Sequence, residues 1–188
     1  MSTPAELLSA AQIAARVDEL ATEIIKDHVP FQAAPKEDAA PLLLVSILRG
    51  AFVFTADLIR ALKTQGLDAE VDFLGLSSYG DATTSSGRVR LTRDLDTDVK
   101  SREVLIIEDI LDSGRTLNFV KTLLVSRGAK SVQTCALLDK PSRRKVAVEA
   151  EFVGFSVPDA FVVGYGMDVA GLGRGLPYIG TMPEDDSD

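Results

Sequence analysis

The chain alternates short, mostly apolar runs with segments in which apolar and polar residues mix. Four of these runs occupy residues 42–47, 71–76, 104–107 and 132–138. The first, LLLVSI, is continuous, which is typical of a strand buried on both faces of a sheet. We therefore predict four strands at these positions, followed by two short β-like pieces at 152–155 and 161–165 and a glycine-rich tail.

Apolar residues at helical spacing lie between the predicted strands. Helices are predicted over residues 9–26, 52–62 and 116–126. In the first of them, Ile13, Val17, Leu20 and Ile24 form one stripe at spacings of four and three. Ser9, with Gln12 three residues later, has the pattern of a capping box. We expect this helix to end near residue 26, ahead of a polar and alanine-rich connection at 30–41.

The alternation of strand and helix predicts an α/β domain with a mostly parallel central sheet flanked by helices. A length of 188 residues fits one domain, or one domain with a small flap. The polar segment at 77–93 contains two glycines, and it is expected to be a mobile loop or an irregular hairpin.

Composition narrows the class of protein. The only cysteine, Cys135, excludes an internal disulfide and fits a reducing cytoplasm. We expect no secretion signal, because the start, MSTPAELLSA, has no basic leader followed by a long apolar run. We expect no membrane partner, because no apolar run approaches the roughly 20 residues that span a bilayer. The net charge of −8 argues against non-specific nucleic-acid binding. Since His28 is the only histidine, acid–base chemistry should fall to carboxylates or lysine.

Three polar clusters follow predicted strands. They are Arg49-Gly50, the stretch from Glu108 to Thr116, and Asp139-Lys140. Ligands of open α/β sheets bind at the carboxyl ends of the strands, so we expect these clusters to meet in one site.

The turn Asp112-Ser-Gly-Arg-Thr116 has the composition of a phosphate site. Gly114 permits a tight turn whose backbone N–H groups could face one concavity, and the helix that follows adds the positive end of its dipole. The hydroxyls of Ser113 and Thr116 could supplement these donors. A simpler interpretation, in which Asp112 or Ser113 only caps the helix, is about equally compatible with this turn alone.

Two adjacent acids, Glu108 and Asp109, precede this turn. They could be solvated acids at a strand end, yet an anion site would normally avoid nearby carboxylates. A ligand that combines phosphate, sugar hydroxyls and a divalent cation would use all of these groups.

The stretch VLIIEDILDSGRTL resembles the phosphoribosyl-pyrophosphate motif of type I phosphoribosyltransferases. The combination of Glu108, Asp109 and Asp112 is similar to that of the 6-oxopurine salvage enzymes, the hypoxanthine-guanine phosphoribosyltransferases. The resemblance includes SILRG, SSYG, LLDK and FVVGYGMD and extends from about residue 40 to 180. It implies a single domain over 1–188, with a core at about 40–150, a flexible active-site loop at about 77–93 and a small C-terminal hood at about 151–182.

The resemblance also implies an activity. The enzyme would transfer the 5-phosphoribosyl group from phosphoribosyl pyrophosphate to N9 of hypoxanthine and/or guanine in purine salvage, releasing pyrophosphate. Mg²⁺ would be the cofactor, and the protein would be a homodimer or homotetramer. Asp112 would be the general base that takes the proton from N7 of the purine.

The remaining roles follow from matching positions. Phosphate and ribose would contact Glu108, Asp109, Asp112, Ser113, Gly114, Arg115 and Thr116; pyrophosphate would contact Arg49, Gly50 and Arg174; Ser78 and Tyr79 would belong to a lid; Lys140, Phe161, Val162 and Asp168 would bind the purine; and Asp168, Glu108 and Asp109 would lie at the metal. The resemblance further implies a cis peptide before Arg49.

Several of these residues have a simpler interpretation. Lys140 could be one more member of a solvated basic patch with Arg143, Arg144 and Lys145, and Phe161 could be a core residue. Because lysine carries only donors, Lys140 facing C6 of a purine would favour an oxopurine over adenine. Two other functions stay open: a non-catalytic, nucleotide-sensing regulator on the same fold, and a transferase that prefers xanthine.

Overall fold

A six-stranded sheet forms the centre of the protein, in a computed structural model that describes residues 3–32, 40–79 and 88–182. Its strands, in spatial order, are β4 (Arg88–Arg93), β3 (Glu70–Tyr79), β2 (Leu43–Leu48), β5 (Glu103–Leu111), β6 (Ser131–Asp139) and β7 (Phe152–Ser156). All neighbours pair in parallel except β4, which is antiparallel to β3. The prediction of a mostly parallel α/β sheet is therefore confirmed.

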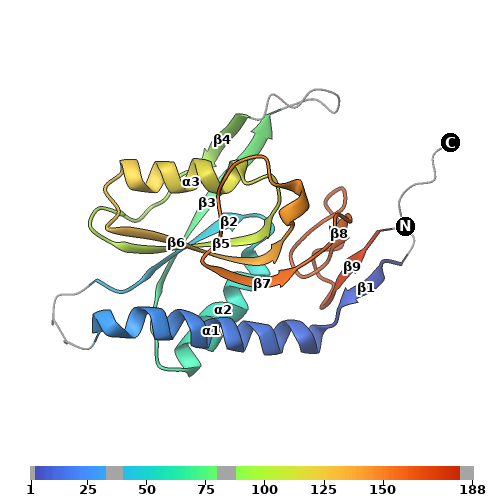
Figure 1. Cartoon of the computed structure of the whole chain (residues 1–188), viewed down its shortest axis with the longest axis horizontal. Helices are drawn as coiled ribbons and strands as arrows, with labels where there is room; N and C mark the ends of the chain where they lie inside the picture. The colour runs from blue at the N-terminus through green and yellow to red at the C-terminus, as the bar shows by residue number, and fades with distance from the viewer. Residues whose placement is uncertain (1–2, 33–39, 80–87, 183–188) are drawn as a thin grey trace.

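Helices cover both faces of this sheet. As Figure 1 shows, α1 (Ala10–Gln32) and α2 (Phe52–Thr64) lie on one face and α3 (Arg115–Ser126) lies on the other. Side chains of β2 alternate between the two cores: Leu44 packs with α1 and α2, and Leu43 and Val45 pack with α3. Burial on both faces explains why the strand sequences are apolar without alternation.

The first helix begins as predicted but ends later. Ser9 and Gln12 form the capping box, since the Ser9 N–H donates to Gln12 Oε1 (2.9 Å) and the Gln12 N–H donates to Ser9 Oγ (3.3 Å). The predicted end near residue 26 is wrong, because α1 includes Pro30 and continues to Gln32. A proline removes one backbone hydrogen bond, which a helix already anchored by a long apolar stripe can tolerate near its end.

A second, three-stranded sheet lies beside the main one. It consists of β1 (Ala5–Leu8), β9 (Ile179–Thr181) and β8 (Val162–Val163), all antiparallel. The sequence analysis missed β1, because AELL carries no local strand signal and its partner β9 is about 170 residues away. The piece predicted at 152–155 is β7, which extends the central sheet through its pairing with β6.

The strand before the phosphate-like turn is longer than predicted. β5 continues from the predicted 104–107 through Glu108 and Asp109 to Leu111, so both acids lie within the sheet rather than after it. The polar segment predicted at 77–93 begins with the end of β3 and ends with β4, which pair as the two arms of a hairpin. Residues 80–87 lie outside the described part of the chain.

The described helices include none that is both long and apolar enough to cross a membrane. Cys135 is fully buried in β6, and burial raises the pKa of its thiol, so this cysteine contributes packing to the core.

Candidate active site

A cavity of about 660 Å³ opens at the carboxyl edge of the central sheet. It brings together ends of β2, β5 and β6 and the segment that enters the small sheet. Residues predicted for the site that line it are Arg49, Gly50, Asp109, Asp112, Lys140, Phe161, Val162, Asp168 and Arg174. The convergence expected from the strand ends is therefore present.

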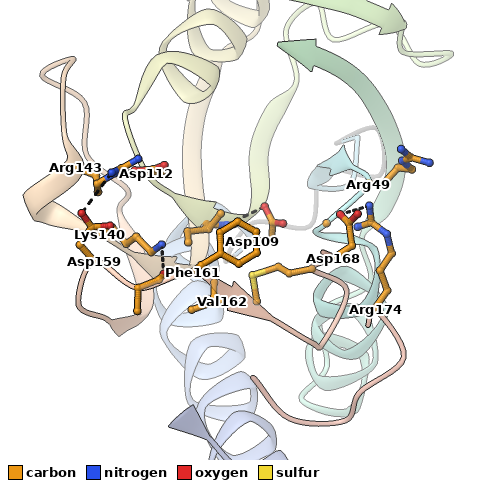
Figure 2. Close-up of a pocket in the computed structure, with 14 residues that line it drawn as sticks. Arg49, Asp109, Asp112, Lys140, Arg143, Asp159, Phe161, Val162, Asp168 and Arg174 are labelled. Carbon is orange, nitrogen blue, oxygen red and sulfur yellow. Dashed lines mark hydrogen bonds and ion pairs between the residues drawn. The ribbon is translucent and has the colours of Figure 1, made fainter. Parts of the chain in front are cut away.

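The cavity has two ends of different character. In Figure 2, Arg49, Asp168 and Arg174 lie on one side of Asp109, and Lys140 and Asp112 lie on the other. At the first end, Arg174 pairs with the Asp168 carboxylate (2.5 Å) and donates to the carbonyl oxygen of Gly166 (2.6 Å). The Leu48–Arg49 peptide is cis, as the resemblance implied, and the Arg49 side chain is exposed. This end therefore presents two guanidinium groups.

The paired acids lie between these two ends. Glu108 is buried, and its pKa is raised well above the ordinary value, first by burial and then by the neighbouring Asp109 carboxylate. Burial also raises the pKa of Asp109, although the Ile110 N–H donates to its Oδ1 (2.9 Å). These carboxyls are not the solvated strand-end acids of the simpler interpretation. Their site favours a cation or a hydrogen-bond donor.

Gly50 allows the Asp109 carboxylate to lie directly against the backbone of the turn that follows β2. A Cβ at residue 50 would fall 1.5 Å from Asp109 Oδ2, so any side chain would displace the carboxylate. This contact joins the end of β2 to the acidic pair on β5.

At the other end of the cavity, Asp112 is held by a charged network. Arg143 Nε pairs with Asp112 Oδ1 (3.2 Å), and Arg143 Nη1 pairs with Asp159 Oδ2 (3.4 Å). Beside them, the buried Lys140 donates from Nζ to the carbonyl oxygen of Ala160 (2.6 Å). Lys140 is therefore a cavity residue and not a member of a solvated patch.

The two hydrophobic residues predicted at the purine site differ in exposure. Phe161 is 59% exposed, although it lies in the wall of the cavity, and Val162 is buried in β8. The alternative in which Phe161 is a core residue is wrong. An exposed aromatic face in a cavity wall is suited to stacking on a flat ring.

The turn after β5 has the backbone shape of an anion site. Gly114 adopts φ 81°, in the left-handed region, and α3 begins at the next residue. Neither Ser113 nor Asp112 caps α3 by a side-chain hydrogen bond to its first turn, apart from a 3.5 Å contact between the Arg115 N–H and Ser113 Oγ. Residues 113–116 continue from Asp112 but do not themselves line the cavity.

The lid residues are only partly described. Ser78 and Tyr79 are the last residues of β3 and pair with Val89 and Arg88 of β4. The tip of the predicted loop, residues 80–87, lies outside the described residues.

Sequence reasoning missed Arg143, Arg144 and Asp159 as site residues. Arg144 is largely buried: it donates to the carbonyl oxygens of Leu111 (3.0 Å) and Asp112 and pairs with Asp139. The basic run SRRK follows a strand end, and this position could have indicated site residues. A run of charges, however, more often forms a solvated surface. Only the fold shows that the adjacent arginines bind different atoms: Arg143 binds the side chain of Asp112, and Arg144 binds its backbone oxygen.

Within the described residues, no cluster of three or more His, Cys, Asp or Glu side chains could hold a metal by itself. Mg²⁺ commonly binds through one or two carboxylates, with substrate phosphates and water completing its shell. The Glu108–Asp109 pair and Asp168 fit that mode, because two of these carboxylates line the cavity and the third is buried beside them.

The chain is similar to a known protein family and to several characterised proteins. Residues 5–170 match the family described as the phosphoribosyl transferase domain. The chain is 48% identical over 176 residues to the hypoxanthine-guanine phosphoribosyltransferase of Bacillus subtilis, covering 94% of this chain and 91% of the relative. It is 46% identical to the hypoxanthine phosphoribosyltransferase of Escherichia coli, covering 94% and 93% of the two chains.

Solved structures agree with these matches. The hypoxanthine phosphoribosyl transferase of Trypanosoma cruzi superimposes with a TM-score of 0.90 at 36% identity, over 97% of this chain and 93% of that one. The hypoxanthine phosphoribosyltransferase of Staphylococcus aureus gives a TM-score of 0.84 at 42% identity, over 95% and 90%.

Proposed function

Since this chain belongs to the phosphoribosyl transferase domain family, we propose that it is a purine salvage enzyme. It transfers the 5-phosphoribosyl group from phosphoribosyl pyrophosphate to N9 of hypoxanthine and/or guanine, giving IMP and/or GMP and pyrophosphate. The observation that carries this proposal is the single cavity in which Lys140 and Phe161 lie at one end and Arg49 and Arg174 at the other.

The purine binds at the end that contains Lys140. Phe161 stacks on the ring, and the Lys140 ammonium donates to the oxygen at C6, in exchange for or in addition to the Ala160 carbonyl that it contacts now. The Val162 backbone and Asp168 read the far edge of the base. Adenine is rejected because its C6 amino group would leave the buried ammonium facing a donor.

Pyrophosphate binds at the other end. The guanidinium groups of Arg49 and Arg174 neutralise its charge, which grows as the bond to the anomeric carbon breaks. Mg²⁺ would be the resident cofactor, and when bound it would supply further neutralisation of the negative charge that develops on the leaving group. Glu108, Asp109 and Asp168 are the residues that would hold it or orient its water shell.

The ribose 5-phosphate occupies the turn from Ser113 to Thr116. The backbone N–H groups of this turn and the first turn of α3 bind the phosphate oxygens. Glu108 and Asp109 accept hydrogen bonds from the ribose hydroxyls. The lid, which includes Ser78 and Tyr79, excludes water from the electrophilic sugar centre.

Asp112 is the general base. As N9 of the purine bonds to the anomeric carbon and pyrophosphate departs, the proton on N7 passes to the Asp112 carboxylate. Asp112 lies between the phosphate turn and the purine end, and Arg143 orients its carboxylate. The C6 oxygen stays bound to Lys140 during this step.

The substitution Asp112→Asn tests this function. We expect kcat to fall by about 10²-fold or more, the usual size of a general base contribution, while IMP still binds. Wild-type chain should form IMP or GMP in a spectrophotometric assay with phosphoribosyl pyrophosphate and Mg²⁺. Unchanged kcat in Asp112→Asn would reject the role of Asp112, and absence of product from every oxopurine with the wild type would reject the enzyme.

The regulator alternative has less support, since the relatives are named as transferases. Xanthine is a third base for the same assay. We also propose the single-domain division with a loop at about 77–93 and a hood at about 151–182. A homodimer or homotetramer in the cytoplasm is the assembly that the resemblance leads us to expect.

A further inference from the structure

We propose that Arg144 is a positioning residue for the phosphate turn. By holding carbonyl oxygens of this turn on one side, Arg144 and the two residues after it direct the amide groups of the turn to the opposite side, where they can bind an anion. The inference rests on the proposed function, since it concerns the residues assigned to the 5′-phosphate.

Three successive carbonyl oxygens, from the last residue of β5 into the turn, are bound by one segment. Arg144 Nη1 donates to the oxygens of Leu111 (3.0 Å) and Asp112. The backbone N–H groups of Lys145 and Val146 both donate to the oxygen of Ser113 (3.0 and 3.1 Å). We call residues 144–146 the buttress.

Peptide geometry gives these contacts a consequence. In a trans peptide, the C=O of one residue and the N–H of the next point in opposite directions. Binding the oxygens of Asp112 and Ser113 on the side of the buttress therefore turns the N–H groups of Ser113 and Gly114 away from it. The buttress, whose residues do not line the cavity, thus sets the direction of two donors.

These donors are free to act. Over the described parts of the chain, the N–H groups of Ser113, Gly114 and Thr116 have no hydrogen-bond acceptor. Unpaired backbone donors are costly unless water or a ligand binds them. Arrayed from the turn into the start of α3, they form a concavity of the kind that binds phosphate.

The buttress and the nearby Val148 also pack closely against the turn. A Cβ at residue 114 would lie 2.7 Å from Val148 Cγ1 and 3.1 Å from both Arg144 Cδ and the Val146 oxygen. Gly114 is therefore required for the close approach of this segment as well as for its positive φ.

Arginine suits this position because its guanidinium is a planar fork. Nη1 reaches the two carbonyl oxygens while Nη2 pairs with the Asp139 carboxylate, which anchors the group on β6. Lysine has its donors on one atom and cannot span these partners in the same way. Arg143, the adjacent residue, binds the side chain of Asp112 instead.

The test compares a ligand that carries the phosphate with one that lacks it. Dissociation constants for IMP and for inosine are measured by calorimetry, directly for IMP and by competition for inosine. In Arg144→Met we expect the affinity for IMP to fall about tenfold to a hundredfold, because misplacing binding groups by about 1 Å causes losses of this size. The affinity for inosine should stay within about twofold of the wild-type value. Arg144→Lys should lose less than Arg144→Met.

Arg127→Met is the matched control. Arg127 follows α3 at the end opposite to the phosphate turn, and it forms a two-pronged pair with Asp94 (2.6 and 2.7 Å). Its loss should leave the preference for IMP over inosine unchanged. If Arg144→Met does not fold, Asp139→Asn keeps the guanidinium but removes its anchor, and it should reduce the same preference.

The outcomes separate the two proposals. A folded Arg144→Met chain, or Asp139→Asn in its place, that prefers IMP as strongly as wild type would overturn the buttress and leave the proposed function standing. Equal losses for IMP and inosine would also overturn it, since they indicate general damage to the site. A wild-type chain that does not prefer IMP over inosine would contradict the proposed function, and it would also contradict the proposed role of the buttress.

Discussion

At the scale of single residues, Glu108 shows how much burial changes an acid. Its position after an apolar run suggested either a solvated strand end or a ligand site. In the structure it is buried within β5 beside a second acid, and its pKa is raised by that burial and by Asp109. The folded state keeps this carboxyl at the expense of stability, which is expected of a residue retained for binding.

Replacing this acid should therefore stabilise the protein in a pH-dependent way. A carboxyl whose pKa is raised on folding binds its proton more tightly in the folded state, so its contribution to the free energy of unfolding falls as pH rises from its unfolded pKa, about 4.3, to its folded pKa. We expect Glu108→Gln to match the wild-type Tm near pH 4 and to exceed it near pH 8. Each 1 kcal/mol regained would raise Tm by about 2–4 °C.

Calorimetric melting of both chains across this range is the measurement. Glu149→Gln is the control, because Glu149 is exposed, and its Tm difference from wild type should not vary with pH. A Tm difference for Glu108→Gln that is constant from pH 4 to pH 8 would contradict the prediction.

At the scale of elements, local sequence predicted the helices and strands wherever their signals were local. The capping box at Ser9, the apolar stripe of α1 and the buried strands β2, β5 and β6 were all anticipated. Boundaries were less accurate: α1 passes Pro30, and β5 extends across the two acids to Leu111. These extensions depend on neighbouring elements that supply burial and ladder partners.

Ser9 offers a test at this scale. Substitution Ser9→Ala removes the Oγ that accepts from the Gln12 N–H, and losing such a cap costs about 1 kcal/mol. We expect Tm to fall by about 2–4 °C with kcat unchanged. Ser126→Ala is the matched control: Ser126 lies in the last turn of α3 and donates only to the Leu123 carbonyl (2.7 Å), so its removal should leave Tm nearly unchanged. A larger loss in Ser126→Ala than in Ser9→Ala would refute the capping role.

At the scale of the whole molecule, the small sheet pairs a strand from the N-terminal end of the chain with two strands from its C-terminal end, beside the cavity. β1 pairs with β9, β9 pairs with β8, and β8 follows Phe161 directly. In Figure 1 these strands lie together at one side of the central sheet. The N-terminal strand is therefore linked, through β9 and β8, to the cavity wall that contains Phe161 and Val162.

Deleting residues 2–8 should weaken this wall. Without β1, β9 gains an exposed edge and β8 loses an indirect support. We therefore expect KM for hypoxanthine to rise about tenfold, because residues in the cavity wall would be misplaced by up to about 1 Å. Far-ultraviolet circular dichroism should still report an intact central fold. Deletion of residues 2–3, which keeps β1, is the control and should leave KM unchanged. An unaltered KM in the longer deletion would show that β1 does not support the site.

The sequence by itself predicted the class of fold and the edge of the sheet at which the cavity opens, and the resemblance of its motif to a family named most of the predicted residues that line this cavity. These features depend on periodicity, strand ends and one contiguous motif, all of which are local. Tertiary structure alone decided that β1 pairs with β9, that Asp109 packs on Gly50, and that Arg143 and Arg144 bind different atoms of Asp112. Such contacts join residues far apart in the chain, and their energies depend on burial and direction, which no local pattern encodes.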